Sequence, residues 1–399
     1  MRFPAFAHRN FRLFWTGNVV SLVGTLAQEA GRGWLVRTLT PDAFTVAAVA
    51  ACGSVPILFL TLFAGALADR VDKKRGLLLT NFISMILAAI LAFLTWKAWI
   101  SVVGLATISL LVGVVNAFDI PMRQSMNVEM VGREDLPNAI ALNSTAFNGA
   151  RVAGPAVGGF LIHTLGMAGC FALNALSFLA LIFNLGRMDL PPAEKNKRAA
   201  GLTEIREGFA FVRDHPTLWP TTLLVAVCSL FALSFSTLMP VFAQDVFKTD
   251  ARGYSILLAS SGAGALFSAA SLAVANAMKH KGKRLLGGAL AFCACVGGFA
   301  FAPTLILACV WLFASGFCLL TFLTTANTLV QTTAPDALRG RVFSLYSLAL
   351  IGAGPIGALW TGAAAKICGP RLGVALSAML AAAWTIGTFW KCRALWKER

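Results

Sequence analysis

The feature that most constrains this chain is a series of long apolar runs that recurs from one end of the sequence to the other. A bilayer core about 30 Å thick is crossed by a helix of roughly 20 apolar residues, so runs of this length predict membrane-spanning helices. The runs fall at residues 11–36, 43–68, 76–96, 99–120, 137–163, 168–187, 217–242, 253–277, 285–302, 304–329, 342–366 and 370–391. The sequence therefore predicts an all-α membrane protein with twelve transmembrane helices.

Charge is scarce, and its distribution sets the expected topology. Apolar residues make up 58% of the sequence and charged residues 13%, against about 45–50% and 25% in soluble domains, which excludes a soluble enzyme. Arg32 and Arg151 lie well inside runs. When lysines and arginines at run ends are counted with the adjoining connection, 25 of the 33 fall at the termini and even-numbered connections and six in odd-numbered connections. Because basic residues accumulate on the cytoplasmic side, we expect both termini to be cytoplasmic. We therefore expect the protein to lie in a lipid bilayer, and we do not expect it to bind nucleic acid.

The longest connection, residues 188–216, separates six runs from six. It is the one stretch with a soluble composition, and we interpret it as a cytoplasmic linker between residues 1–187 and residues 217–399. Its apolar residues recur at helical spacing: Leu202, Ile205, Phe209 and Val212. This pattern predicts a short amphipathic helix, either lying on the membrane or serving as a structural strap.

The two halves resemble each other. At an offset of 200 residues, Asn127 matches Asn327, and Gly154-Pro155 matches Gly354-Pro355. A duplicated six-span unit of like orientation is typical of transporters, in which two bundles rock around a site between them. The pattern predicts two pseudo-symmetric six-helix bundles in a chain that works as a monomer.

Ionisable residues inside a span cost about 2.5–3.5 kcal/mol on insertion scales, so they are functional candidates. In the first run, Glu29 and Arg32 lie three residues apart on one helix face and can pair. We expect Glu29, with Arg32, to couple transport to protons; a permanent Glu29–Arg32 ion pair that only stabilises the helix is the alternative. Polar residues spaced 3, 4, 3 and 4 form a stripe along the same helix, which is expected to face a central cavity: Asn18, Ser21, Thr25, Gln28 and Arg32.

Arg151 lies near the middle of the fifth run, with Asn148 about one turn before it. Three roles remain open for this arginine: it could bind an anionic cargo, counter the charge of Glu29, or hold backbone carbonyls. Asn148 and Arg151 are both cavity candidates.

Asp119 and Arg123 are spaced i and i+4 across the cytoplasmic end of the fourth run, which favours a gate pair. The seventh to twelfth runs contain no acidic residue, and their polar content is mostly hydroxyl and amide. Thr324 and Asn327 are the cavity candidates in that half. A proton switch made from a buried carboxylate is therefore expected in the first half.

Motifs of soluble enzymes are absent. The sequence holds no phosphate-binding loop ending in Gly-Lys-Ser/Thr, no His-Glu-x-x-His and no Gly-x-Ser-x-Gly. We therefore expect no enzymatic activity, no cofactor and no metal, and we expect secondary transport of a small molecule in preference to ATP-driven pumping.

Several motifs resemble those of the major facilitator superfamily. Gly65-Ala-Leu-Ala-Asp69-Arg70-Val-Asp72-Lys73-Lys74-Arg75 has the Gly-x-x-x-Asp-Arg-x-x-Arg/Lys form found between its second and third spans. Asn116-Ala-Phe-Asp-Ile-Pro-Met-Arg123 and the segment Val131–Asn143 resemble its bacterial exporter branch, which includes enterobactin exporters and drug exporters. The resemblance covers nearly the whole chain and implies the major facilitator fold.

The resemblance also implies a role for the connection between the second and third runs. There, Asp69 and the charged residues after it (Arg70, Asp72, Lys73, Lys74 and Arg75) would form a cytoplasmic latch, with the carboxylate favoured at a helix N-terminus of the opposite half. The alternative is a basic loop that only sets topology.

A further motif in the fifth run, Gly154-Pro155-Ala-Val-Gly158-Gly159, resembles the Gly-Pro-x-x-Gly-Gly motif of superfamily antiporters. Its glycines allow close helix contact, and Pro155 lets the span bend. Ala150 replaces an earlier glycine of the motif, and the fourth run lacks the arginine common in these antiporters. The expected activity is proton-coupled export of a small amphipathic organic molecule, a drug-like compound or siderophore. An importer or lipid flippase on the same fold, and a non-transporting receptor or assembly protein, are the alternatives.

Overall fold

The structure is a computed structural model that describes residues 3–68, 71–132, 134–189, 202–274, 280–335 and 338–392. Packing divides the chain into two compact units. The first unit contains residues 1–39 and 52–199, and the second contains residues 40–51 and 200–399. Helix α2 therefore begins in the second unit and continues in the first.

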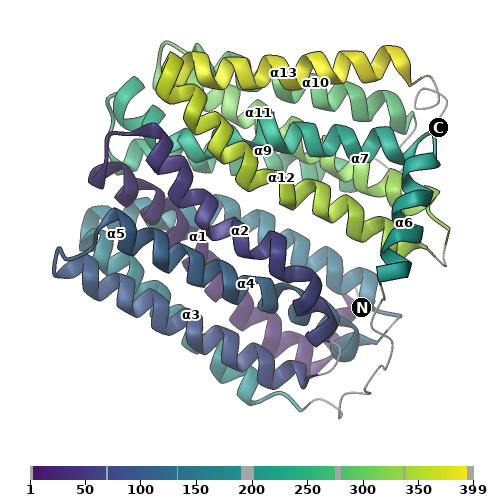
Figure 1. Cartoon of the computed structure of the whole chain (residues 1–399). Helices are drawn as coiled ribbons and strands as arrows, with labels where there is room; N and C mark the ends of the chain where they lie inside the picture. Colours follow the sequence, from purple (N-terminus) through teal and green to yellow (C-terminus); the bar gives the residue numbers. More distant parts are fainter. Residues whose placement is uncertain are drawn as a thin grey trace. The chain divides into compact units, whose positions relative to one another are not determined.

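Long helices make up the first unit (Figure 1). In chain order they are a short 3-10 helix η1 (Pro4–Ala7), α1 (Arg9–Leu39), α2 (Ala43–Ala68), α3 (Lys73–Trp96), α4 (Val102–Val131) and α5 (Leu136–Gly186). Helix α5 contains one residue with non-helical dihedral angles, Gly166, at φ 72°. Because a positive φ suits glycine, this residue divides α5 into the predicted fifth and sixth spans.

The second unit is also helical. It contains α6 (Leu202–Asp214), α7 (Leu218–Val227), η2 (Cys228–Ala232), η3 (Leu233–Leu238), α8 (Met239–Val241), η4 (Phe242–Val246), α9 (Ala251–Val274), α10 (Lys281–Ala300), α11 (Leu305–Thr333), α12 (Arg339–Cys368) and α13 (Pro370–Lys391). Elements α7 to η4 follow one another without a loop and form one segment, Leu218–Val246.

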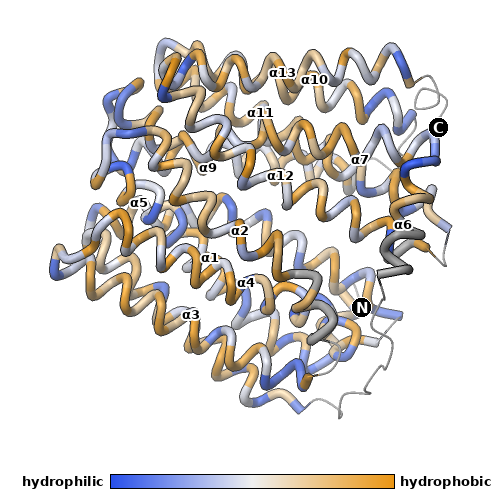
Figure 2. The backbone as a smooth tube through the Cα atoms, in the orientation of Figure 1, coloured by the Kyte–Doolittle hydropathy of each residue, from blue (hydrophilic) through white to orange (hydrophobic). Residues whose placement is uncertain are grey.

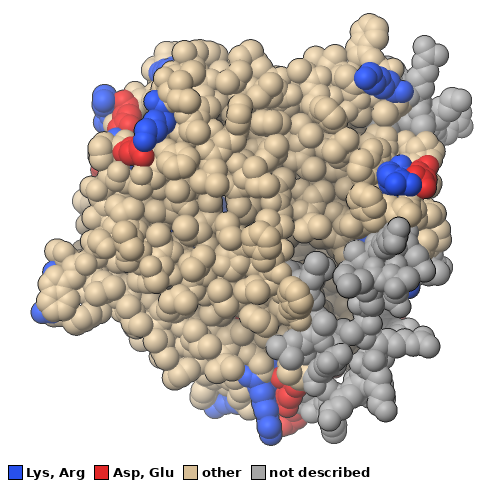
Figure 3. All heavy atoms as spheres, in the orientation of Figure 1, with Lys and Arg blue, Asp and Glu red and all other residues tan. Residues whose placement is uncertain are grey.

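Ten helical segments in the described residues are long and apolar enough to cross a bilayer. They include α5, which Gly166 divides in two, and they omit α1, whose polar stripe lowers its hydropathy. With these two adjustments the predicted twelve spans are accounted for, and the all-α membrane fold is confirmed. Figure 2 shows the helices as mainly hydrophobic along their length, and Figure 3 shows charged side chains gathered at helix ends on the visible face.

The first unit is built around a close contact between α1 and α5. Three glycines of α1 are seven residues apart and face the second half of α5: Gly17, Gly24 and Gly31. A Cβ atom on Gly17 would lie 2.9 Å from the Leu181 Cα, and one on Gly24 would lie 2.5 Å from the Ser177 Oγ. Small residues at this spacing let two helices approach closely in lipid, so this contact fixes the rotation of α1 about its axis.

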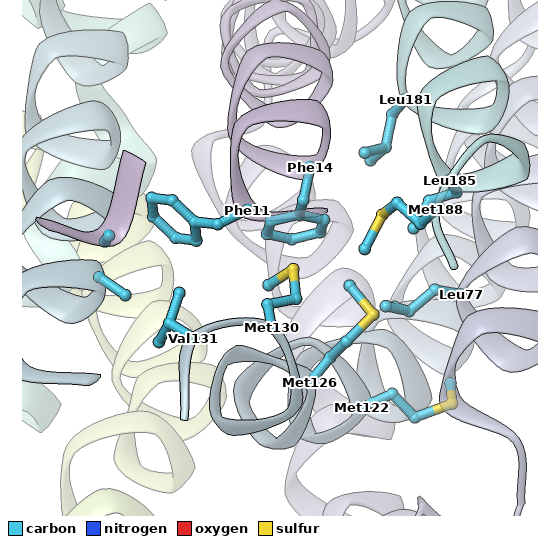
Figure 4. Packing of buried hydrophobic residues seen from close by; sticks show 12 residues of the cluster. Phe11, Phe14, Leu77, Met122, Met126, Met130, Val131, Leu181, Leu185 and Met188 are labelled. Carbon is cyan, nitrogen blue, oxygen red and sulfur yellow. The ribbon is translucent and has the colours of Figure 1, made fainter. Parts of the chain in front are cut away.

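Helix α4 continues beyond the predicted span end at residue 120 to Val131. The extra turns carry Met122, Met126 and Met130, whose spacing of four places them on one face. All three are buried with Phe14 in a core cluster at this end of the first unit. Figure 4 shows Met126 and Met130 rising from α4 towards Phe14 and Met188. The prediction ended too early because the extension is amphipathic and buries its apolar face against the protein.

The segment Leu218–Val246 is irregular where the sequence predicts a regular helix. Two π-helical turns, Cys228–Ala232 and Phe242–Val246, flank a 3-10 stretch, Leu233–Leu238. Pro240 contributes to this irregularity because it has no amide hydrogen to continue an α-helical ladder. The segment also runs four residues past its predicted end and so includes Asp245, which corrects the expectation that this half carries no acid in its spans.

Helix α6 lies in the linker and packs against α12 and α7. A Cβ on Gly208 would lie 2.9 Å from the Arg341 Cβ of α12, and Val212 is fully buried. Phe209 is 44% exposed and contacts Trp219 edge to face, with ring centroids 6.0 Å apart. These contacts favour the strap interpretation of the linker helix.

Asp42 begins α2 as its N-cap. Its Oδ2 accepts hydrogen bonds from the Thr45 amide at 3.1 Å and the Thr45 hydroxyl at 2.7 Å. The Thr45 hydrogen bonds hold the pKa of the Asp42 carboxyl below its ordinary value of 3.8. We expect Asp42→Ala to lower the free energy of unfolding by about 1 kcal/mol at pH 7, the usual cost of losing an N-cap.

This difference depends on pH with a definite sign. Since the folded-state pKa of Asp42 is lowered, its ionised form stabilises the fold fully above the unfolded value, and the benefit is lost as pH falls through the folded value. Unfolding of wild type and Asp42→Ala in detergent at pH 7, 5 and 3.5 measures it. A difference that grows on acidification would contradict the assignment, and Thr45→Val is the matched variant that removes one of the two donors.

Candidate functional site

The polar stripe of α1 divides between helix packing and charged residues. Gln28 is buried and its Oε1 accepts a hydrogen bond from the Asn174 amide of α5 at 2.9 Å. Ser21 is buried as well, and Thr25 is half-buried. Because polar groups in a bilayer gain from pairing between helices, Gln28 serves as a contact inside the first unit.

Glu29 lies on the side of α1 opposite the three glycines, since successive residues turn about 100° around a helix. It is exposed, although it lies about 15 Å along the helix axis from the end of α1 at Leu39. Among the described residues, Glu29 forms no ion pair and accepts no hydrogen bond. The Glu29–Arg32 ion pair that the spacing allows is therefore not formed.

Arg32 and Arg151 occupy different surroundings. The Arg32 guanidinium lies against α2, where a Cβ on Gly53 would be 3.9 Å from its Nη2. Arg151 is half-buried, midway between Leu136 and the break at Gly166, and Glu29 attracts it electrostatically. We call Glu29 and Arg151 the charged pair. Arg151 donates to no described residue, so it holds no described backbone carbonyl in this structure, and its roles as a cargo-binding group or as a countercharge to Glu29 stay open.

A second polar group, which we call the Asp119 network, consists of Asn18, Thr80, Asn81, Asp119 and Arg123. Asp119 is 9% exposed and lies about three helical turns before the end of α4. Its Oδ1 accepts from the Thr80 hydroxyl at 2.8 Å and the Asn81 amide at 3.2 Å. The network thus joins α3 to α4 through one carboxylate.

Arg123 completes the Asp119 network. Its Nε and Nη2 lie 2.8 and 2.7 Å from the Asp119 Oδ2, and its Nη1 donates to the Asn18 Oδ1 of α1. The i, i+4 pair that the sequence predicts is present, and it connects three helices of one unit. Thr80 and Asn81 were not predicted, although they are adjacent polar residues inside an apolar run, which is a recognisable signal.

The basic segment at the start of α3 is bound to other helices of the first unit. Asp69 and Arg70 lie outside the described residues. Asp72 caps α3 by accepting from the Arg75 amide at 3.1 Å, and Lys73 pairs with Glu129 of α4. Lys74 donates to the carbonyls of Gly186 and Met188 at 3.2 and 2.5 Å. A cation is favoured there because the last carbonyls of a helix carry partial negative charge.

The Gly-Pro motif packs within the first unit. Cβ atoms on Gly154 and Gly158 would lie 2.5 Å from the Leu26 Cβ and 2.9 Å from the Ala27 carbonyl oxygen. Pro155 and Gly159 are buried, and helical geometry continues through Pro155. The bend in α5 occurs at Gly166, so the motif acts in this structure as a contact surface for α1.

The candidates in the second unit lie on α11. Asn327 is half-buried, and its Oδ1 accepts from the Gln331 amide at 2.6 Å. Thr324 is half-buried and its carbonyl accepts from the Thr328 hydroxyl at 2.9 Å. Asn148 in the first unit is buried and donates to the Ser144 carbonyl at 2.9 Å. These amides keep local partners on their own helices.

Known proteins resemble this chain along most of its length. Residues 2–397 match a family described as transmembrane secretion effector. The multidrug efflux pump Tap of Mycolicibacterium fortuitum is 28% identical, over 87% of this chain and 89% of the relative. The enterobactin exporter EntS of Shigella boydii is 27% identical, over 75% and 72%. The staphyloferrin A transporter of Staphylococcus aureus is 26% identical, over 68% of each chain.

Solved transporter structures share the fold. A bacterial homologue of the lysosomal transporter Spinster superposes with a TM-score of 0.71 at 15% identity, covering 96% of this chain and 98% of its own. A POT family transporter reaches a TM-score of 0.75 at 12% identity, covering 98% and 97%. The family match across the chain confirms the resemblance seen in the sequence motifs and indicates a transporter and not an enzyme. The chain therefore belongs to the transmembrane secretion effector family of the major facilitator superfamily.

Proposed function

We propose that this chain exports a small amphipathic organic molecule, a drug-like compound or a siderophore, across the bacterial inner membrane in exchange for protons. The observation that carries the proposal is the match to a secretion family over residues 2–397, together with relatives named as efflux pumps and exporters. Alternating access of two six-helix bundles is the mechanism that such a duplicated fold favours.

In this mechanism the charged pair binds both the proton and the cargo. Glu29 is exposed within a spanning helix and has no hydrogen-bond donor among the described residues. An acid in such a position can take up a proton from the side of the membrane to which the protein is open. Protonation neutralises Glu29, so Arg151 loses the negative charge that attracted it. Arg32, held against α2, contributes positive potential to the same helix.

The Asp119 network and the segment around Asp69 act as the moving parts on the cytoplasmic side. The network joins three helices through one buried carboxylate, so a movement of Arg123 is expected to shift α1, α3 and α4 together. Lys73 and Lys74 fix the base of the latch segment to the first unit through Glu129 and the end of α5. Asp69 and Arg70 are proposed to make the latch itself.

Liposomes that contain purified protein test the export proposal. The substrates are a panel of amphipathic dyes, lysolipids and siderophores. When the liposome interior is acidic, we expect at least one of them to accumulate inside, carried by transporter molecules whose cytoplasmic side faces the external medium. Accumulation without any pH dependence would favour a flippase, and accumulation only through molecules of the opposite orientation would favour an importer. A protein that transports no member of the panel would contradict the proposal.

Orientation is tested separately. We expect a single cysteine at Ala193, in a cysteine-free background, to resist an impermeant thiol reagent applied to intact cells, because 25 of 33 basic residues fall on that side. A cysteine at Ala98, in the connection between α3 and α4, is the matched control and should be labelled. If Ala193→Cys were labelled and Ala98→Cys were protected, the predicted orientation would be wrong.

A further inference from the structure

The charged pair also bears on the kind of cargo that the first unit recognises. Glu29 and Arg151 are opposite charges on neighbouring helices, α1 and α5, and each lies three residues from the contact between Leu26 and Gly154. Each lies within a spanning helix, where an unpaired charge is costly. Their electrostatic attraction is present, yet no hydrogen bond or ion pair joins them.

The Arg151 guanidinium has five N–H donors, and none of them donates to a described residue. None of its nitrogens is among the buried atoms that lack a partner, so none of them is wholly enclosed by the protein. Glu29 is exposed and has no donor among the described residues. The protein therefore leaves one exposed anion and one half-buried forked cation, both without a described hydrogen-bond partner, on two helices that are in contact.

Several other charges of this unit are engaged. Arg123 is bound to Asp119 and Asn18, Lys73 to Glu129, and Lys74 to helix carbonyls. Arg32, like Arg151, is half-buried and donates to no described residue, and its guanidinium lies beside Gly53 of α2. Arg151 is the arginine on a neighbouring helix that Glu29 attracts electrostatically, so these two opposite charges form a candidate site between α1 and α5.

We propose that the cargo is an ampholyte, which binds with a cationic nitrogen at Glu29 and an anionic group, such as a carboxylate, at Arg151. A molecule carrying both charges satisfies both groups at once, whereas a simple cation or anion leaves one of them without a partner. A carboxylate also fits the guanidinium fork in a bidentate way. This inference rests on the proposed function and specifies its substrate class.

The assignment agrees with exchange against protons. A cationic nitrogen at Glu29 and a proton compete for the same carboxylate, so cargo binding displaces the proton. The anionic group at Arg151 holds the cargo while the carboxylate changes partner. Neither step requires a cofactor or a covalent intermediate.

Three xanthene dyes of similar size test the class of cargo by equilibrium binding to purified protein in nanodiscs. Rhodamine B carries a cationic xanthene and a carboxylate, its ethyl ester carries only the cation, and fluorescein carries only anionic groups. We expect rhodamine B to bind wild type about tenfold more tightly than the ester, the usual size of a charge-assisted contact. Fluorescein should bind more weakly than rhodamine B.

The variants assign each charge to its partner. Arg151→Gln should bring rhodamine B down to the affinity of the ester and leave the ester unchanged. Glu29→Gln should weaken both cationic dyes and strengthen fluorescein, because a repulsive carboxylate has been removed. Arg187→Gln, which changes an exposed arginine at the end of α5, is the matched control and should alter none of the three affinities.

If Arg151→Gln does not fold, Arg151→Lys is the second variant. Lysine keeps the positive charge of Arg151 but lacks the bidentate geometry of the guanidinium. It should keep part of the preference for rhodamine B over its ester. Equal affinities of the two in wild type, a preference that survives Arg151→Gln, or no binding of any dye would each overturn the inference. Because binding is measured without a gradient, its failure is distinct from a failure of export.

Discussion

Replacing Arg123 by methionine is expected to lower the free energy of unfolding by about 3 kcal/mol, the largest stability effect that the structure predicts. The change removes two contacts to Asp119, at 2.8 and 2.7 Å, and the one to Asn18. It leaves the Asp119 carboxylate, 9% exposed, without its countercharge in the interior of a helix bundle. Removing one partner of a buried ion pair costs about 3–5 kcal/mol because the other charge stays buried.

A double-mutant cycle separates this penalty from lost packing. Asp119→Asn together with Arg123→Met should cost less than the sum of the two single changes, since the double variant leaves no unpaired charge. Unfolding in mixed micelles measures all four proteins. Arg187→Met is the control for the loss of an exposed arginine. A loss of under about 0.5 kcal/mol for Arg123→Met would show that the network is a surface feature.

The second large effect is functional. Glu29→Gln is expected to reduce pH-gradient-driven accumulation by at least about tenfold, while the variant still folds and binds cargo. The amide has nearly the size of the carboxylate, but it cannot take up and release a proton in the working pH range. The residual binding should also depend less on pH than that of wild type.

Initial uptake rates in liposomes at several imposed pH gradients measure this effect. Glu134→Gln is the matched control, because it makes the same chemical change at an exposed position in the connection before α5. A Glu29→Gln protein that accumulates cargo with an unchanged pH profile would remove Glu29 from the coupling mechanism. The coupling would then have to involve Asp119 or another group.

The fold could be predicted from the sequence because span length and hydropathy are local properties. Twelve apolar runs of about 20 residues have few alternatives to twelve helices in a bilayer. The end of α4 was wrong for a physical reason: Met122, Met126 and Met130 bury an amphipathic extension against Phe14. Hydropathy detects what faces lipid, and it misses turns whose apolar face is covered by protein.

The site was predicted less completely because its geometry depends on how the helices are rotated and placed. Spacing correctly paired Asp119 with Arg123, but it could not place Thr80 and Asn81 around the same carboxylate. The polar stripe was expected to face one cavity, yet Gln28 is buried and accepts a hydrogen bond from Asn174 of α5, while Arg32 lies against Gly53 of α2.

The Glu29–Arg32 pair illustrates the same limit. A separation of three residues brings two side chains within reach, but neighbouring helices decide which way each side chain turns. Arg32 lies against Gly53 of α2, and Glu29 is attracted to Arg151 of α5. Both partners come from other helices, and no local spacing in α1 identifies them.

Proton movement driven by cargo is the most direct test of the central claim, exchange of a small organic molecule for protons. Liposomes that contain the protein and an entrapped pH-sensitive dye are given a gradient of the best substrate of the panel, with no imposed pH gradient. We predict that substrate flowing in one direction drives protons in the other, and that Glu29→Gln abolishes the proton signal. Substrate flux through the wild-type protein with no accompanying change in internal pH would contradict the account.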